Sequence, residues 1–254
     1  EHTRVKILVC IKQVPDTEAL LRIAADQITI SVAGVKFILN PYDEYALEEA
    51  LRIKEANPGS LVRAVTLGPA RCAEVLRNAA AMGADEVLHL SADEPALDGL
   101  AAARALSRAA ASFSPDLILL GKESIDDGNM QVGPMLAELL GLPCLTVVTR
   151  LTLAGASLSA ECERDDGTAL FEAPLPAVVT CQKGLNEPRY PSIRGKMAAM
   201  EMAIPEEPAA LEAGRLRIAS LIPPPARAGG RNVGEGAAAV PELIRLLHTE
   251  ARVI

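Results

Sequence analysis

The amino-acid sequence predicts an α/β fold built on a mostly parallel sheet. Short runs rich in Val, Ile and Leu alternate with longer segments of helical spacing, and the first run, 5–11, is apolar at nearly every position. A strand that is apolar throughout is typical of a sheet covered by helices on both faces. Regular alternation of such strands with helices is typical of the α/β class.

The expected elements follow one another with start and stop signals. Further strands are expected at 61–67, 86–90, 116–121, 144–149 and 177–181. Between Pro69 and Gly83, apolar residues recur at helical spacing, at Cys72, Val75, Leu76, Ala79 and Ala80. The same spacing recurs in 132–140, before Gly141, and more loosely in 47–54. Each of these segments predicts an amphipathic helix that covers the sheet.

The pattern changes in the second half of the chain. Residues 151–161 and 169–174 partly alternate in polarity and flank the acidic turn 165–167, which predicts a β-hairpin excursion. The last part of the chain contains a triple proline, several glycines and a final helix-like segment. We therefore expect one α/β domain over residues 1–204 and an extended C-terminal arm over 205–254 that docks on a partner.

Composition argues against several classes of function. The 254 residues carry 25 Lys+Arg against 33 Asp+Glu, a net charge of −8, with three Phe, three Tyr and no Trp. A nucleic-acid partner is not expected, because it would need a basic surface and stacking rings. Direct membrane insertion is not expected either, because no apolar stretch approaches the roughly 20 residues that cross a bilayer and the N-terminus does not look like a signal peptide. The five cysteines are dispersed without a CxxC pair, which argues against a disulfide framework and a zinc site and favours a cytoplasmic location.

Segment 121–134 is the first candidate for a ligand site, because it follows an expected buried strand and opens a helix. Its backbone could approach a ligand closely at three glycines, Gly121, Gly128 and Gly133. Asn129 and Gln131 offer neutral hydrogen-bonding groups. Asp126 and Asp127 would repel a phosphate, so we expect them to hold ribose hydroxyls or to cap the turn. The alternative is a strand-to-helix loop without a ligand, because the spacing matches neither the Walker loop nor the dinucleotide fingerprint.

A second candidate is segment 40–50. Asn40 and Pro41 form a helix start, and acidic residues follow in the first turn, where the helix dipole favours them. A well-capped helix explains most of this pattern. It does not explain Tyr42, which lies so near the start that it could face an adenine or a flavin.

The third candidate is segment 184–197, in which prolines and glycines enclose Tyr190 and Ile193. Three methionines follow, Met197, Met200 and Met202, and methionine-rich surfaces adapt to several partners. Periodicity by itself favours the alternative, a core-facing loop and helix.

Motifs for catalysis by side chains are not found. The sequence has no Ser/His/Asp arrangement, no Cys/His pair at a motif spacing, no HExxH and no carboxylate pair with an obvious acid/base role. No catalytic residue and no metal ligand are therefore expected.

Several motifs, in the same order, resemble the beta (small) subunit of electron transfer flavoprotein over nearly the whole chain. The matching segments are 9–16, 40–43, 48–50, 68–70, 81–85, 121–134, 176–180 with the acidic hairpin before it, and 185–190. The resemblance implies a doubly wound α/β fold of the adenine-nucleotide-binding (HUP-like) type, paired with a larger alpha subunit with which it shares FAD. It also implies transfer of electrons from flavin dehydrogenases, typically acyl-CoA dehydrogenases, to an acceptor such as a membrane quinone oxidoreductase. The absence of catalytic side chains is then expected, because the flavin carries the chemistry.

The resemblance further implies a buried adenine-nucleotide site within this subunit. The residues carried over by position are Cys10, Asn40, Pro41, Tyr42, Asp43, Ala64, Leu67, Gly121, Lys122, Glu123, Ser124, Ile125, Asp126, Asp127, Gly128, Asn129, Met130, Gln131 and Val132. In most family members the ligand is AMP, whereas electron-bifurcating members hold a second FAD and read Asp-Gly-Asp-Thr-Ala-Gln-Val-Gly-Pro. Residues 127–130 depart from that pattern, although 9–16 and 184–191 look more like the bifurcating branch. We expect AMP, with a second FAD as the alternative.

Partner contacts are also implied by position. Ile193 lies where the family places a leucine that anchors the dehydrogenase, with Tyr190 and Met197 beside it. Glu163 falls near a family glutamate that pairs with an arginine of the flavin domain, and Glu161 or Asp165 could serve instead.

Two other classes could share this fold. A solitary stress-type ATP-binding module would not need the C-terminal arm. An enzyme that transfers an adenylyl group would need clustered basic residues at the loop, where only Lys122 is available.

Overall fold

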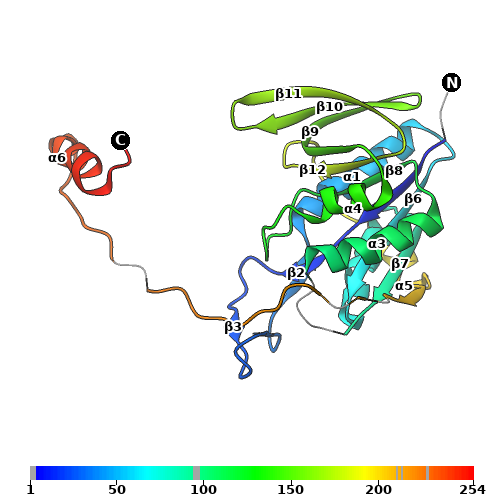
Figure 1. The fold of residues 1–254 in the computed structure, drawn as a ribbon, viewed down its shortest axis with the longest axis horizontal. Coiled ribbons are helices and arrows are strands. Elements are labelled where there is room, and N and C mark those ends of the chain that lie inside the picture. Colours follow the sequence, from blue (N-terminus) through cyan, green and yellow to red (C-terminus); the bar gives the residue numbers. More distant parts are fainter. Residues whose placement is uncertain (1–3, 94–97, 210, 213, 227–228) are drawn as a thin grey trace. The chain divides into compact units, whose positions relative to one another are not determined.

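The computed structural model describes residues 4–93, 98–209, 211–212, 214–226 and 229–254 (Figure 1). The chain divides into two compact units, Glu1–Leu221 and Ile222–Ile254. The second unit contains η2 (Ala237–Ala239), α6 (Val240–Leu246) and a π-helical turn, η3 (Leu247–Ala251). The expected arm starts at residue 205, but residues 206–208 form a strand of the first unit.

The first unit is built on a nine-stranded sheet with the order β11-β10-β9-β12-β8-β1-β6-β7-β13. All neighbours from β9 through to β13 pair in parallel, whereas β10 pairs antiparallel with both β9 and β11. The parallel strands are β1 (Lys6–Cys10), β6 (Leu61–Gly68), β7 (Glu86–Ser91), β8 (Leu117–Gly121), β9 (Cys144–Ala154), β12 (Ala177–Cys181) and β13 (Glu206–Pro208). Every residue of β8 and β12 is buried, as a strand covered on both faces requires.

Helices cover both faces of this sheet (Figure 1). The helices α1 (Pro41–Ala56) and α2 (Ala73–Met82) share one apolar core with the sheet, and α3 (Gly99–Phe113) and α4 (Val132–Leu140) share the other. A short 3-10 turn, η1 (Ala70–Cys72), precedes α2, and α5 (Ile193–Glu201) packs on α2. The predicted doubly wound α/β fold is thereby confirmed.

Helix boundaries follow from backbone chemistry. Pro41 begins α1, where its missing N–H has no intrahelical partner to lose. Gly83 and Gly141 end α2 and α4 with φ of +131° and +66°, which L side chains rarely adopt. These residues were the start and stop signals in the sequence.

The second half of the sheet differs from the expected single hairpin. The acidic turn does join β10 (Ser157–Arg164) to β11 (Gly167–Pro174), but a second turn at Gly155, with φ +60°, separates β9 from β10. The excursion is therefore a three-stranded antiparallel meander. Two small antiparallel pairs, β2 (Gln13–Pro15) with β5 (Phe37–Leu39) and β3 (Arg22–Ile23) with β4 (Ile30–Ser31), were not predicted because each strand has only two or three residues.

The topology places a crevice at the ends of β1 and β8. From β1 the chain proceeds through α1 to β6 on one side, and α3 later returns it from β7 to β8 on the other side. Because α1 and α3 cover opposite faces, they diverge at the carboxyl ends of these two neighbouring strands. Ligands of open α/β sheets bind at such a point of reversal.

Candidate functional site

A cavity of about 150 Å³ opens at the carboxyl ends of β1 and β8. Its wall contains most of the residues carried over for a nucleotide, namely Cys10, Asn40, Asp43, Leu67, Gly121, Lys122, Glu123, Ser124, Asp127, Asn129, Met130, Gln131 and Val132. Residues outside the predicted set complete the wall: Ile11, Lys12, Gly99, Ala102, Leu106, Leu120 and Gly133. Strand ends, the start of α1, one face of α3 and the loop before α4 thus meet around one space.

The remaining residues of the predicted set lie outside the cavity wall: Pro41, Tyr42, Ala64, Ile125, Asp126 and Gly128. Ala64 is fully buried on the face of the sheet that packs against α1 and α2. The Tyr42 ring lies 5.1 Å from the Lys122 ammonium, a cation–π contact. In this structure the tyrosine that could have faced an adenine therefore lies beside a lysine.

Asp43, in the first turn of α1, ties the ends of β1 and β8 together. Its buried carboxylate accepts hydrogen bonds from the backbone N–H of Lys12, at 2.7 Å, and of Gly121, at 2.8 Å. Burial raises the pKa of this carboxyl to about 7, although the N–H donors favour its charged form. The side chain that the sequence indicated as a helix-dipole acid thus also fixes two strand ends at the cavity.

Asn40 holds the loop that follows β8. Its side-chain Nδ2 donates to the Glu123 carbonyl at 2.9 Å, and its Oδ1 accepts from the Ile125 N–H at 3.2 Å. Because both ends of the buried amide are used on the loop, the side chain makes no capping bond to α1. The start of α1 and the loop are therefore held as one structure.

Lys12, one residue beyond the end of the apolar run, forms ion pairs with both acids of the loop. Its Nζ lies 2.8 Å from Asp126 and 3.2 Å from Asp127, and it donates to the Ser124 hydroxyl at 3.0 Å. Asp127 also accepts from the Ser124 hydroxyl at 2.6 Å. Burial by itself would raise the pKa of the Asp127 carboxyl. Its hydrogen bonds to Ser124 and Lys12 and the charge of Lys12 outweigh burial, so that this pKa is lowered. Asp126 thus binds Lys12, and Asp127 binds both Lys12 and the Ser124 hydroxyl.

Lys12 was not among the predicted site residues. From the sequence, Lys122 was the one basic residue near the loop. Lys12 was overlooked because it and the acids are more than a hundred residues apart along the chain. Its place directly after an expected strand was the signal, since carboxyl ends of parallel strands meet at one edge. The wall residues of α3 are apolar or glycine and offered no comparable signal.

Two glycines of the loop are required by protein contacts. A Cβ at Gly121 would lie 2.6 Å from the Cβ of Tyr42, and one at Gly133 would lie 2.4 Å from Thr180 Cγ2. Gly121 thus lies close to α1 and Gly133 lies close to β12, whereas the sequence suggested that these glycines allow close approach to a ligand. Gly128, with φ +61°, serves the turn.

The N-terminus of α4 adjoins the cavity and has no side-chain cap. The first N–H groups of a helix have no intrahelical acceptor and carry a partial positive charge. Val132 and Gly133 therefore present backbone donors where a negatively charged ligand group could accept.

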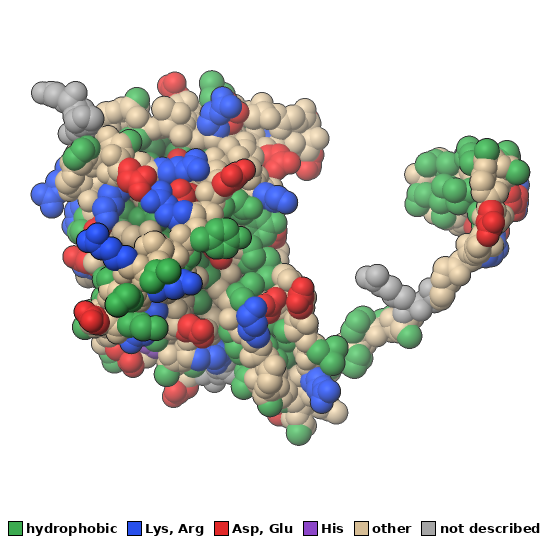
Figure 2. All heavy atoms as spheres, turned by 180° about the vertical axis from the view of Figure 1, so that it is seen from behind, with side chains coloured by type: hydrophobic (Ala, Val, Ile, Leu, Met, Phe, Trp, Pro, Cys, Tyr) green, Lys and Arg blue, Asp and Glu red, His purple; other side chains and the backbone are tan. Residues whose placement is uncertain are grey.

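The residues predicted to contact a partner form a second surface. Tyr190, Ile193 and Met197 are 96%, 81% and 65% exposed, and Figure 2 shows hydrophobic side chains gathered near α5 beside Lys and Arg side chains. The core-facing helix favoured by periodicity is wrong. Its small residues, Gly195 and Ala199, face α2, because a Cβ at Gly195 would lie 2.2 Å from the Ala81 carbonyl oxygen. The large apolar residues consequently point outward.

Glu163 lies on β10, within the antiparallel meander. Its carboxylate accepts a hydrogen bond from the Gln182 side chain at 2.8 Å. Neighbouring Glu161 lies 3.1 Å from Arg150 of β9, so the two acids have different partners in this chain.

Other classes of site are not found in the residues that the structure describes. Within these ranges no helix is long and apolar enough to span a membrane, and no group of His, Cys, Asp and Glu side chains could hold a metal ion. All five cysteines are free. Burial and nearby Asp43 raise the pKa of Cys10, so its thiol faces the cavity in the neutral form.

Comparison with known proteins agrees with this geometry. The model of the electron transfer flavoprotein domain matches residues 27–212. A protein of Syntrophomonas wolfei named electron transfer flavoprotein subunit beta is 40% identical over 225 residues, which are 89% of this chain and 88% of the relative. Proteins of the same name from Bacillus subtilis and Homo sapiens are each 38% identical, covering 98% and 90% of this chain and 99% and 92% of their own length.

The family model covers most of the cavity wall and all of α5. Each of the three relatives aligns with more than two thirds of this chain and of its own length. The fold, the carboxyl-end cavity and the order of the motifs lead to the same conclusion. This chain belongs to the electron transfer flavoprotein family, as a beta subunit.

Proposed function

We propose that this chain pairs with an electron transfer flavoprotein alpha subunit, and that the heterodimer carries electrons from flavin dehydrogenases, such as acyl-CoA dehydrogenases, to an acceptor such as a membrane quinone oxidoreductase. FAD shared with the alpha subunit supplies the electron-carrying chemistry when bound. This chain contributes surfaces: Ile193 with Tyr190 and Met197 contacts the dehydrogenase, and Glu163 faces the flavin domain. Residues 205–254 dock on the alpha subunit. We place the heterodimer in the cytoplasm, where the free cysteines would stay reduced.

We further propose that the cavity at β1 and β8 holds AMP in a structural role. The observation that carries this assignment is the state of the loop acids: Asp126 and Asp127 are bound by Lys12, beside the uncapped start of α4. Two unpaired acids beside the cavity would repel a phosphate, whereas Lys12 offsets one of their two negative charges and the free N–H donors at the start of α4 attract a phosphate. The apolar part of the wall, including Leu67, Leu106 and Leu120, suits a purine ring.

The decisive experiment is to produce the chain with its alpha subunit, denature the purified complex and quantify the released nucleotides by chromatography. One FAD and one AMP per heterodimer would support the electron shuttle with a structural nucleotide. Two FAD and no AMP would overturn the AMP assignment and favour the electron-bifurcating form. A stable solitary chain that releases ATP and has no larger partner would overturn the heterodimer and favour a stress-type module.

A further inference from the structure

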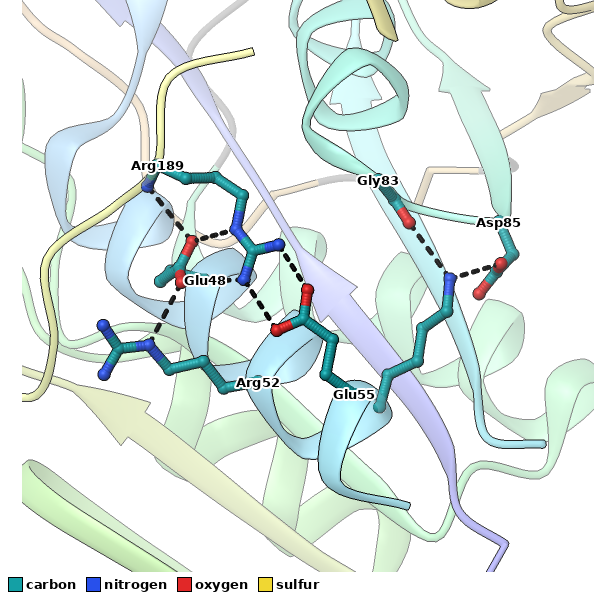
Figure 3. A network of polar contacts seen from close by, with 7 residues as sticks. Glu48, Arg52, Glu55, Gly83, Asp85 and Arg189 are labelled. Carbon is teal, nitrogen blue, oxygen red and sulfur yellow. Dashed lines mark hydrogen bonds and ion pairs between the residues drawn. The ribbon is translucent and has the colours of Figure 1, made fainter. Parts of the chain in front are cut away.

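The chain segment that leads from β12 into α5 is tied to α1 by one arginine. The Arg189 guanidinium donates to both carboxylate oxygens of Glu48, at 2.8 and 3.0 Å, and to both of Glu55, at 2.5 and 3.2 Å (Figure 3). The backbone N–H of Arg189 also donates to Glu48, at 3.1 Å. A planar guanidinium can bind two carboxylates in this bidentate manner, which holds its position and its orientation together.

The two carboxylates lie in different surroundings. The Glu48 side chain is only 4% exposed, whereas that of Glu55, two helical turns further on, is 60% exposed. Arg52 also binds Glu48, at 3.1 Å, but both of these residues lie on α1, so this ion pair stays within one helix. Among these cations, Arg189 is therefore the one that connects α1 to the segment.

The same segment has a second tie to α1. The Asn186 side chain donates to the Tyr45 carbonyl at 3.0 Å and to the Glu49 carboxylate at 2.9 Å. Residues 186 and 189 thus fasten the segment on the N-terminal side of the exposed Tyr190.

Helix α5 is fastened on the other side. The Ser192 hydroxyl caps it by accepting from the Gly195 N–H at 3.0 Å, and Arg77 of α2 donates to the Ala199 carbonyl at 2.9 Å. Gly195 allows the helix to approach α2 closely. The helix is therefore held on α2 independently of α1.

Tyr190 lies between these two fastenings, and Ile193 is the first residue of α5; both side chains are exposed. Neither gains much from its own burial, so other groups must hold this stretch of backbone. A loose stretch would lose conformational freedom when a partner binds, and that loss would weaken the binding.

We propose that Arg189 is a positioning residue for partner recognition: by binding Glu48 and Glu55 it preorganises residues 187–193, so that the dehydrogenase meets Tyr190 and Ile193 in their binding arrangement. This inference rests on the proposed function, in which Ile193 contacts the dehydrogenase. Arg189 acts through the segment and itself needs no contact with the partner.

The test uses the complete heterodimer and an acyl-CoA dehydrogenase that reduces the unmodified heterodimer. Arg189→Gln is expected to raise the KM for the heterodimer roughly tenfold with little change in kcat, because docking is impaired and electron transfer within the docked complex is not. FAD content should be unchanged. Arg52→Gln is the matched control, because it also removes a cation from Glu48, and its KM should stay within about twofold of the unmodified value.

A gentler variant keeps the test decisive if Arg189→Gln fails to fold. Glu55→Gln weakens the exposed half of the contact and leaves the buried Glu48 paired with Arg189 and Arg52. We expect its KM to rise roughly threefold. Hydrogen exchange of residues 187–193 in the isolated heterodimer should accelerate in both variants and not in Arg52→Gln.

A double-mutant cycle separates positioning from direct contact. If Arg189 acts through the segment, Arg189→Gln combined with Ile193→Ala should raise KM much less than the product of the two single effects. If the two effects multiply, Arg189 contributes independently of Ile193 and the proposal is overturned.

The outcomes also distinguish this proposal from the one on which it rests. If Ile193→Ala leaves KM unchanged, the dehydrogenase surface is assigned wrongly and the role of Arg189 falls with it. If Ile193→Ala raises KM while Arg189→Gln and Glu55→Gln do not, the surface stands and only the positioning role is refuted.

Discussion

The cavity and the α5 surface are held in place by different kinds of bonds. At the cavity, buried side chains such as Asp43 and Asn40 bind backbone groups of the neighbouring strand ends and loop. At the α5 surface, Arg189 binds carboxylates, one of which is largely exposed to water. Buried polar groups are costly to leave unpaired, whereas exposed ion pairs contribute little and are screened by salt. A change at the cavity should therefore disturb folding and nucleotide content, and a change at the surface should disturb partner binding.

The largest effect is expected for Gly121→Ala, which would break the cavity side of this comparison. The added Cβ would lie 2.6 Å from both Tyr42 Cβ and Asp43 Oδ1, so the strand end and α1 would have to separate. We expect a loss of about 3 kcal/mol in the free energy of unfolding, measured by denaturation of the heterodimer. Gly99→Ala is the control, because its Cβ would meet nothing nearer than the Gln131 side chain at 3.4 Å. Equal stability of the two variants would contradict the assigned contact.

The next effect concerns Asp43 and pH. Burial raises its pKa from the ordinary 3.8 to about 7, so the folded state holds the proton more tightly than the unfolded state does. Protonated Asp43 therefore adds to the free energy of unfolding; this contribution is complete below about pH 4 and is lost as the pH rises to about 7. We expect the stability advantage of the unmodified protein over Asp43→Asn to shrink by about 2 kcal/mol between about pH 5 and pH 7. Denaturation curves at these pH values would check this, and a constant difference would contradict it.

A smaller effect is expected for Lys12→Gln, which leaves the loop acids without their cation. We expect retention of AMP to weaken roughly tenfold, because Asp126 and Asp127 would then repel the phosphate. Isothermal titration of the nucleotide-depleted heterodimer with AMP measures the change. Lys36→Gln is the matched control, because Lys36 also binds an acid, Asp16 at 2.6 Å, but does not line the cavity. Combining Lys12→Gln with Asp127→Asn should restore part of the affinity.

The smallest effect is expected from salt, and it sharpens the contrast between the two regions. Raising NaCl from about 0.05 to about 0.5 M should accelerate hydrogen exchange of residues 187–193 roughly twofold, because Glu55 is exposed and its attraction to Arg189 is screened. At the cavity, the Gly121 amide should not respond, because the Asp43 carboxylate that accepts its hydrogen bond is buried and is little screened by salt. An equal response of both segments would show that the two regions are not held differently.

Local chemistry made much of the fold predictable. Continuous apolar runs identified the strands that are covered on both faces, and Gly83 and Gly141 marked the helix ends. Prediction failed where the local signal was short or ambiguous. The two-residue strands β3 and β4 have no resolvable period, and the turn at Gly155 lay within an apparently continuous strand.

The candidate site was predictable as a set of segments and not as a set of contacts. The loop 121–134 and the helix start at Asn40 were recognised from residue type and position. The bonds between them join residues far apart in the chain, as between Asp43 and Gly121, which are separated by 78 residues. Such pairs share no local pattern, so neither the ion pairs of Lys12 nor the two hydrogen bonds of Asn40 to the loop were predictable from the sequence.

The sequence by itself determined the α/β class, the location of the loop that follows β8 and the family to which the chain belongs. These follow from local hydrophobic periods, turn residues and the order of motifs. Only the tertiary structure decided which face of α5 is buried and which partner each charged side chain takes. The physical reason is that the hydrophobic period of α5 favours a buried helix and does not show which face is buried, whereas the close contact of Gly195 with α2 turns the small residues inward and leaves Ile193 and Met197 exposed.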